Sequence, residues 1–210
     1  MLHTLIKWWE RRETARLRGL FREVGDGCVF EGHRLEVKGD VRLGAACVLG
    51  NNLVFRAHKN GVIRIGDRAV IDHYVLLQAN DSVTVGAGAY VGAYCVVRDT
   101  NHLFFGTDVH WRLTPHITRP VVLEENCWLG PRCYIMPGVT IGRGAVIGPA
   151  SVVNKDVPPL EIWAGNPARR VGHRLEPDKV PTFKRDLAIW SLFFPPGSVS
   201  GAASSGTEAD

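Results

Sequence analysis

Three histidines lie within one segment of the sequence, NHLFFGTDVHWRLTPHITRP, which runs from Asn101 to Pro120. They are His102, His110 and His116. An imidazole can remove a proton from a substrate near neutral pH, because its ordinary pKa lies close to that range. A general base also needs a fixed mounting, and His102 stands at the point where the segment leaves the preceding chain. The sequence therefore predicts a proton-transfer site at His102.

The residues on both sides of this segment follow a six-residue repeat. Three hexads make a block of eighteen residues, and five such blocks begin at Val41, Ile63, Val83, Val121 and Val139. Every hexad carries a bulky apolar residue at the same position. An α-helix cannot keep one face at a strict sixfold spacing, whereas a triangular coil of three short strands can. We therefore expect five coils stacked about 4.8 Å apart, in a prism roughly 24 Å tall.

All insertions between the blocks follow a third hexad. They are HKNGV at 58–62, NDS at 80–82, and the long segment at 101–120, which we call the arm. Glycine follows the bulky residue at eight places in the first two hexads, where a tight bend favours it, and at none in the third. Loops and polar side chains should therefore converge on one edge of the prism, the third corner. The arm, predicted to lack regular structure, is the largest of these loops and is expected to carry function.

Composition narrows the class of protein. The chain has 210 residues, 45% of them hydrophobic, which excludes a disordered chain and suffices for one domain with a sizeable core. Its net charge of +4 is not clustered beyond the first two dozen residues, so no nucleic-acid partner is expected. Five cysteines without a CxxC pair favour a reducing compartment. Without a secretory signal or a run of eighteen apolar residues, the protein is expected to be cytoplasmic.

The two ends of the chain differ from the repeat. Residues 1–27 form a predicted N-terminal helical segment, because apolar residues recur there at helical spacing with Arg and Glu between them. This amphipathic helix should pack near the end of the prism or against a neighbouring subunit, with a weak contact to a membrane surface as the alternative. Residues 173–195 predict a short apolar C-terminal helix over the last coil, and residues 196–210 a disordered tail.

The repeat, its length and the closing segment WAGNPARRV, from Trp163 to Val171, resemble the hexapeptide-repeat acyltransferases. The resemblance covers residues 28–172. It is greatest to the branch of galactoside, maltose, chloramphenicol and virginiamycin O-acetyltransferases. It implies an all-β fold, a left-handed parallel β-helix of about five full coils from which the arm protrudes. It also implies a homotrimer whose active sites lie between neighbouring prisms.

The resemblance assigns roles to particular residues. A histidine at the root of the arm is the catalytic base of these relatives, and His102 matches it. Other positions match residues that hold the hydroxyl groups of the acceptor or line the channel near the base. Several relatives have Asn where this chain has Asp72, which leaves the identity of the acceptor open. The implied substrate-binding residues are Asp72, Asn80, Asp81, Asn101 and Trp128.

Acetyl-CoA is the implied co-substrate, and no metal is expected. Small residues match positions along the pantetheine channel of relatives, and cations near the end of the repeat can meet the CoA phosphates. Pro131 stands where some relatives offer a backbone N–H near the thioester, so the donor to the oxyanion is unassigned. The expected cofactor-binding residues are Gly130, Pro149, Asn154, Lys155, Arg169 and Arg170.

The leading functional hypothesis is direct acetyl transfer from acetyl-CoA to a sugar hydroxyl in a polysaccharide or glycolipid precursor, with His102 as general base. N-acetylation of an amino sugar and acetylation of an antibiotic are alternatives within the same family. Two further alternatives are a zinc carbonic anhydrase built on the same fold and a non-catalytic scaffold. A zinc site of that kind needs a close pair of histidines on adjacent coils. The coil-borne His58 and His73 are fifteen residues apart, which argues against it.

Overall fold

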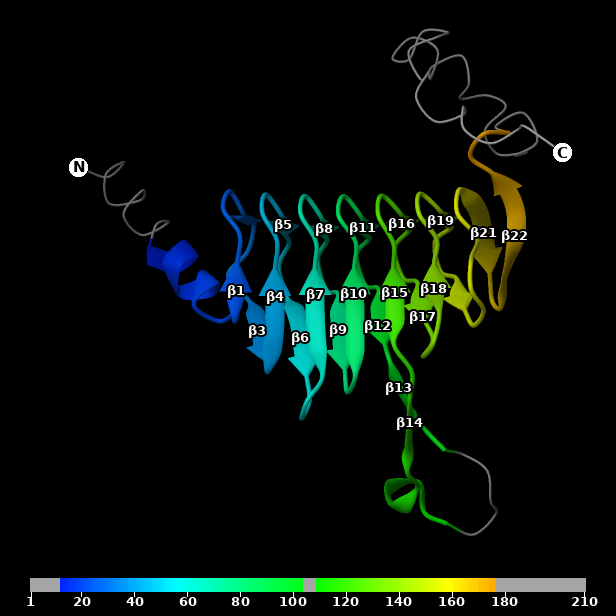
Figure 1. Cartoon of the computed structure of the whole chain (residues 1–210), viewed down its shortest axis with the longest axis horizontal. Helices are drawn as coiled ribbons and strands as arrows, with labels where there is room; N and C mark the ends of the chain where they lie inside the picture. The colour runs from blue at the N-terminus through cyan, green and yellow to red at the C-terminus, as the bar shows by residue number, and fades with distance from the viewer. Residues whose placement is uncertain (1–11, 104–108, 177–210) are drawn as a thin grey trace, which may run out of the picture.

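The computed structural model describes residues 12–103 and 109–176, and winds them into a parallel β-helix (Figure 1). Three sheets run along the prism, and each coil contributes one strand to each sheet. The first sheet consists of β1 (Glu23–Val24), β4 (Asp40–Leu43), β7 (Val62–Ile65), β10 (Ser82–Val85), β15 (Val121–Leu123) and β18 (Thr140–Ile141).

The second sheet follows the first corner of each coil. It consists of β2 (Val29–Phe30), β5 (Val48–Leu49), β8 (Val70–Ile71), β11 (Tyr90–Val91), β16 (Trp128–Leu129), β19 (Val146–Ile147), β21 (Glu161–Gly165) and β22 (Ala168–His173). The third sheet follows the second corner. It consists of β3 (Leu35–Lys38), β6 (Leu53–Ala57), β9 (Leu76–Ala79), β12 (Val96–Arg98), β17 (Tyr134–Ile135) and β20 (Val152–Val153).

The predicted register of the five blocks is confirmed. Ile63 pairs with Val83, and Val83 with Val121, so the starts of successive blocks lie directly above one another. Every bulky position of the five blocks is buried inside the prism. Ser151, the one polar residue among the smaller inward positions, is buried too, and its hydroxyl donates to the Gly148 carbonyl at 2.6 Å. A continuous apolar column therefore fixes the pairing of every coil.

One coil lies outside the predicted repeat. The strands β1, β2 and β3 form a sixth complete coil below the five predicted ones, so the β-helix begins at Glu23 and not at residue 28. Its inward positions Val24, Phe30 and Val37 pair with Leu43, Leu49 and Phe55 of the next coil. The hexad pattern misses it because Val37 follows Phe30 by seven positions instead of six.

The N-terminal segment covers the open end of this first coil (Figure 1). Residues 12–18 are α-helical, and Leu17 is almost fully buried. The Phe21 ring lies 6.2 Å from that of Phe30 and 6.3 Å from that of Phe55. Packing at this end of the prism, one of the two predicted positions, is thus observed. Most of the predicted membrane-contacting residues, 1–11, lie outside the described residues.

An antiparallel hairpin ends the other side of the prism. β21 joins β19 in parallel, and β22 folds back on β21. The segment WAGNPARRV spans this hairpin. The predicted C-terminal helix and tail lie almost wholly outside the described residues. Within the described parts of the chain, no helix is both long and apolar enough to cross a membrane.

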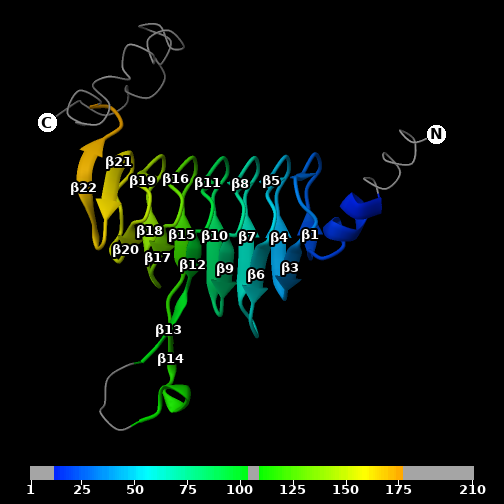
Figure 2. The same cartoon turned by 180° about the vertical axis from the view of Figure 1, so that it is seen from behind.

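The arm projects from the third corner, away from the prism (Figures 1 and 2). The prediction that the arm lacks regular structure is wrong for the part of the arm next to the prism. β13 (Thr100–His102) and β14 (His116–Thr118) form an antiparallel ribbon, followed outward by a short 3₁₀ helix at Trp111–Leu113. The Thr100 and Thr118 hydroxyl oxygens lie 3.1 Å apart across the ribbon. Cross-strand pairing therefore gives the two ends of the arm a regular mount.

Candidate active site

Asp99 anchors the arm to the prism at the bend between β12 and β13. Its carboxylate is fully buried and accepts hydrogen bonds from the backbone N–H groups of Asn80, at 2.9 Å, and Asp81, at 2.7 Å. The Thr100 hydroxyl donates to the same carboxylate at 2.7 Å. The Arg119 N–H donates to the Asp99 carbonyl at 2.8 Å, so the returning end of the arm meets the same residue. Asp99 thus joins the NDS loop to both ends of the arm.

Replacing Asp99 with alanine is expected to lower the free energy of unfolding by about 3 kcal/mol, because the N–H groups of Asn80 and Asp81 would lose the buried carboxylate that accepts from both. Asp99→Asn should lose less, since it keeps one acceptor oxygen. Thermal unfolding measures both. The matched control is Asp156→Ala, which removes an exposed carboxylate that accepts one N–H bond, from Thr140, and should cost much less. Equal losses at the two positions would contradict the anchoring role.

His102 lies at the end of β13, half-buried, with contacts on both ring nitrogens. Its Nδ1 lies 3.4 Å from the Thr114 hydroxyl oxygen, and its Nε2 lies 3.3 Å from Nε2 of His116. The His102 N–H donates to the Asn101 side-chain oxygen at 2.9 Å, and the Leu103 N–H donates to the Pro115 carbonyl. The backbone and ring of His102 are therefore both held, as a general base requires.

A second polar cluster lies at the second corner, between β8, β11 and β16. The Tyr90 hydroxyl donates to the Asp72 carboxylate at 3.0 Å. Burial and the neighbouring Asp72 carboxylate raise the pKa of Tyr90 above its ordinary value. Trp128 stands directly above Tyr90 in the sheet and is 50% exposed. These side chains line a cavity of about 520 Å³ together with Gly92, Ala93 and Pro131.

The predicted substrate-binding residues therefore fall into two groups within one chain. Asn80, Asp81 and Asn101 lie at the third corner with His102, whereas Asp72 and Trp128 lie at the second corner. The strands of the third sheet separate the two corners. A single chain does not bring the two groups together.

The predicted pantetheine residues stack at the second corner. A Cβ atom added at Gly130 would lie 2.8 Å from the Pro149 nitrogen, so any larger residue there would collide with the next coil. Close packing of coils accounts for Gly130 without a ligand. Pro149 is exposed beside it.

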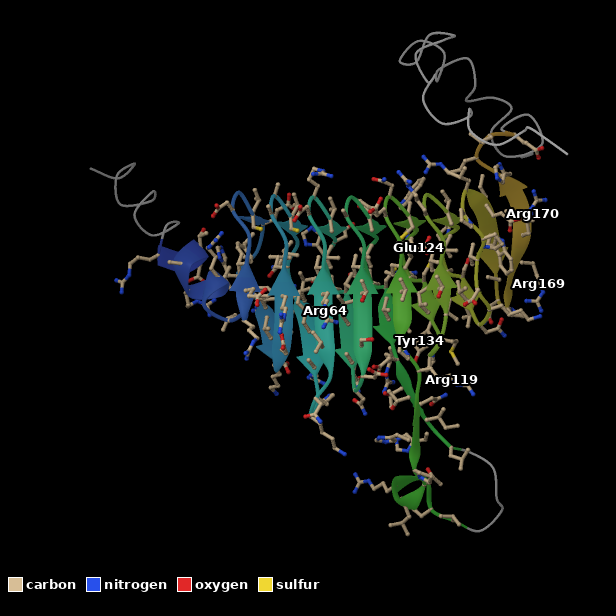
Figure 3. The ribbon with its side chains drawn as sticks, in the orientation of Figure 1. Arg64, Arg119, Glu124, Tyr134, Arg169 and Arg170 are labelled. Atoms are coloured by element: carbon tan, nitrogen blue, oxygen red, sulfur yellow. The ribbon has the colours of Figure 1, made fainter. Side chains whose placement is uncertain are left out.

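The predicted phosphate-binding residues lie near the C-terminal end of the prism. Asn154 and Lys155 are exposed after β20. Arg169 and Arg170 extend from β22, while Arg119 lies at the root of the arm (Figure 3). Arg170 donates to the Glu161 carboxylate at 2.9 Å, and this ion pair offsets its charge. Lys155 and Arg169 are thus the better candidates for contacting a phosphate.

The histidines of the coils do not form a metal site. His73 Nδ1 accepts a hydrogen bond from the Asn51 N–H at 2.8 Å, which is a structural contact between adjacent coils. Over residues 12–103 and 109–176, no three His, Cys, Asp or Glu side chains gather in a way that could hold a metal ion.

Sequence reasoning did not assign three residues of these clusters: Asp99, Tyr90 and His116. Asp99 and Thr100 do stand where the third hexad ends and the arm begins, which was an available signal for a polar anchor. The contact of Tyr90 with Asp72 and that of His116 with His102 depend on strand pairing and carried no local signal.

Comparison with known proteins places the repeat in a family. Residues 120–155 match the family model of the bacterial transferase hexapeptide, described as six repeats. The chain is 32% identical over 135 residues to the putative colanic acid biosynthesis acetyltransferase WcaF of Escherichia coli, covering 61% of this chain and 70% of WcaF. A probable acetyltransferase of Mycobacterium tuberculosis is 27% identical over 70% of this chain, and the match spans only 51% of that relative.

Solved structures agree with this placement. A hexapeptide-repeat acetyltransferase of Vibrio cholerae, complexed with acetyl-CoA, is 29% identical with a TM-score of 0.56, covering 78% of this chain and 77% of that one. The N-acyltransferase AntD of Bacillus cereus has a TM-score of 0.66 over 86% of this chain and 94% of its own, at 18% identity, and so supports the left-handed β-helix fold alone. The repeat, its register and the extent of the match to WcaF together show that the chain belongs to the hexapeptide-repeat acetyltransferase family.

Proposed function

We propose that the protein is an acetyl-CoA-dependent O-acetyltransferase that modifies a sugar hydroxyl in a polysaccharide or glycolipid precursor. The observation that carries the proposal is His102, an imidazole mounted on a paired ribbon at the root of the arm, with Thr114 and His116 beside its ring. The names of two relatives support the sugar acceptor: WcaF, and the putative lipopolysaccharide biosynthesis O-acetyl transferase WbbJ of Escherichia coli, 30% identical over 62% of this chain.

The proposed reaction is a direct transfer. His102 removes the proton of the acceptor hydroxyl while that oxygen attacks the thioester carbonyl of acetyl-CoA. The new C–O bond forms, the C–S bond breaks, and the proton passes from His102 to the departing sulfur. Lys155 and Arg169 supply cations for the CoA phosphates, and Gly130 and Pro149 border the pantetheine chain of CoA. Because the co-substrate is acetyl-CoA, we place the protein in the cytoplasm.

We further propose that the functional unit is a homotrimer in which the third corner of one chain faces the second corner of its neighbour. This assembly would unite His102 with Asp72 and Trp128, which one chain keeps apart. The second corner also carries an exposed aromatic surface typical of interfaces. Tyr74 and Tyr94 stack there at 4.7 Å, with the Arg132 guanidinium 5.7 Å from the Tyr94 ring.

An acceptor screen tests the proposed function. Release of free CoA thiol from acetyl-CoA is measured with a panel of glycosides, nucleotide sugars, amino sugars and chloramphenicol. We expect turnover with a sugar that carries only hydroxyl groups, and a product that mild alkali cleaves as an ester. Turnover confined to amino sugars, with an alkali-stable amide product, would contradict O-acetylation. AntD is named an N-acyltransferase, so the panel must include amino sugars.

A further inference from the structure

Two arginines stand beside Asp99, where the arm joins the prism. Arg98 precedes Asp99 at the end of β12, and the Arg119 N–H donates to the Asp99 carbonyl at 2.8 Å. The side chain of Arg119 lies over Gly138, because a Cβ atom added there would lie 3.1 Å from two carbons of Arg119. The pairing of β12 with β17 places Met136, which follows β17, beside Arg98. Both arginines therefore border the same turn of the next coil, and Figure 3 shows Arg119 at the root of the arm.

The guanidinium of Arg98 lacks the partner that a buried cation needs. Arg98 is half-buried on the outer face of β12, because the preceding Val97 points into the core. Its Nε atom is buried and has no hydrogen-bond partner among the residues that the structure describes. Neither Arg98 nor Arg119 takes part in an ion pair within that part of the chain. The hydrogen bonds to the neighbouring Asp99 carboxylate come instead from a hydroxyl and two backbone N–H groups.

Arg56 shows how an arginine at the equivalent position is satisfied. The register of β6, β9 and β12 places Arg56 two coils below Arg98, on the same outer face. Its Nε donates to the Glu36 carboxylate at 2.8 Å, and a second guanidinium nitrogen donates to the other oxygen at 3.2 Å. Arg98 has the same donors at the same position, without such a carboxylate in the described chain. An anion with two oxygen atoms would complete it in the same way.

Asn80 carries a second buried atom of this kind. Its side-chain oxygen also lacks a partner, and among the described residues only these two buried side-chain polar atoms do. Both belong to residues that adjoin Asp99, since Arg98 precedes it in the chain and the Asn80 N–H donates to its carboxylate at 2.9 Å. Buried polar atoms are nearly always paired, so two exceptions at one anchor indicate a ligand. An acceptor oxygen and a cation match a sugar that carries both a hydroxyl and an anionic group.

We propose that Arg98 is a specificity residue that binds an anionic group of the acceptor, with Asn80 accepting from one of its hydroxyls and Arg119 adding positive charge. This inference rests on the proposed function. The anion is a carboxylate, as in a uronic acid, or a phosphate, as in a sugar phosphate or nucleotide sugar, since both offer paired oxygens to a guanidinium. Arg98 precedes His102 by four residues, so their Cα atoms lie at most about 14 Å apart. An acceptor bound through its anion at Arg98 can therefore present a hydroxyl to His102.

Matched acceptors test the charge requirement. Methyl glucuronide is compared with methyl glucoside, methyl galacturonide with methyl galactoside, and glucose 1-phosphate with methyl glucoside, by release of CoA thiol. A neutral sugar remains an acceptor, but in at least one pair the anionic member should have a kcat/KM about 10-fold to 100-fold higher, as expected for charged hydrogen bonds. The pair that shows this distinguishes a carboxylate from a phosphate. If no pair favours the anion, the inference is wrong; if no hydroxyl acceptor is turned over at all, the proposed function fails.

Substitutions at Arg98 assign the preference to this residue. Arg98→Met removes the charge from a long side chain, so the preference for the anionic member should be lost. Arg98→Lys keeps the charge without the paired donors and should retain part of the preference. The KM for acetyl-CoA should stay within about twofold, and a large rise would instead assign Arg98 to CoA. Arg68→Met is the matched control, because Arg68 is an exposed arginine at the first corner, and it should keep the full preference.

Stability separates ligand binding from a structural role. Arg98→Met removes a buried N–H that has no acceptor, so without acceptor the variant should melt at or above the temperature of the unmodified protein. The preferred acceptor should raise the melting temperature of the unmodified protein more than that of Arg98→Met. An ion pair between Arg98 and a neighbouring chain would give the opposite result. The variant would then melt lower and dissociate on size-exclusion chromatography with its preference for the anion unchanged, which would overturn the inference.

Discussion

Replacing His102 with alanine is expected to lower kcat for acetyl transfer by about 10²-fold to 10⁴-fold, the usual contribution of a general base. The KM for acetyl-CoA should change little, because the residues proposed to hold CoA lie on the last coils and not on the arm. The loss arises in the transition state, where the acceptor oxygen must shed its proton while it attacks the thioester. Steady-state release of CoA thiol with the acceptor found in the screen measures it.

Stability gives the internal control for this substitution. The side chain of His102 is only half-buried and lies outside the hydrophobic core. His102→Ala should therefore melt within a few degrees of the unmodified protein. Asp99→Ala, by contrast, should melt early. A His102→Ala variant that is folded and fully active would leave the protein as a scaffold or as an enzyme with another base. A folded and inactive variant would support the proposed role.

Much of the fold was predictable because the prism repeats one local rule. A bulky residue at every sixth position can be buried only if three short strands turn the chain through a full coil, so the columns through Leu49 and Ile71 specify the pairing of the second sheet. The first coil was not predicted, because one extra residue between Phe30 and Val37 breaks the six-residue spacing. It lies at the end of the prism, where half-buried side chains suffice and the sequence is less constrained.

The candidate site was predictable only in part, for a physical reason. His102 could be found because an interruption of the repeat marks it. Asp99 binds the backbone of residues 18 and 19 positions earlier, in the preceding coil, and a backbone N–H leaves no trace in the sequence. His116 contacts His102 only because the two ends of the arm pair as a ribbon. That pairing was not predicted, since the arm was expected to be irregular. Sequence spacing locates loops, but contacts between loops depend on coil stacking and strand pairing.

The site proposed to lie between neighbouring chains predicts the second large effect, which is the recovery of activity when two inactive variants are combined. One chain carries His102→Ala, and the other carries Asp72→Ala together with Trp128→Ala. Each variant alone should form an inactive trimer, because every interface lacks one half of the site. The two chains are co-expressed with different affinity tags, and mixed trimers are isolated by successive use of both tags.

Every mixed trimer should regain activity, whichever chain is present twice. In a closed three-fold ring, one chain's third corner meets the next chain's second corner, so a trimer of two kinds of chain has one interface where both halves are intact. The expected specific activity is therefore about one third of that of the unmodified protein. A His102→Ala chain carrying both tags passes through the same purification and should stay inactive. If each chain held a complete site, no mixture could recover activity, because every chain would keep its own defect; recovery thus requires that His102 and the Asp72–Trp128 cluster act across an interface.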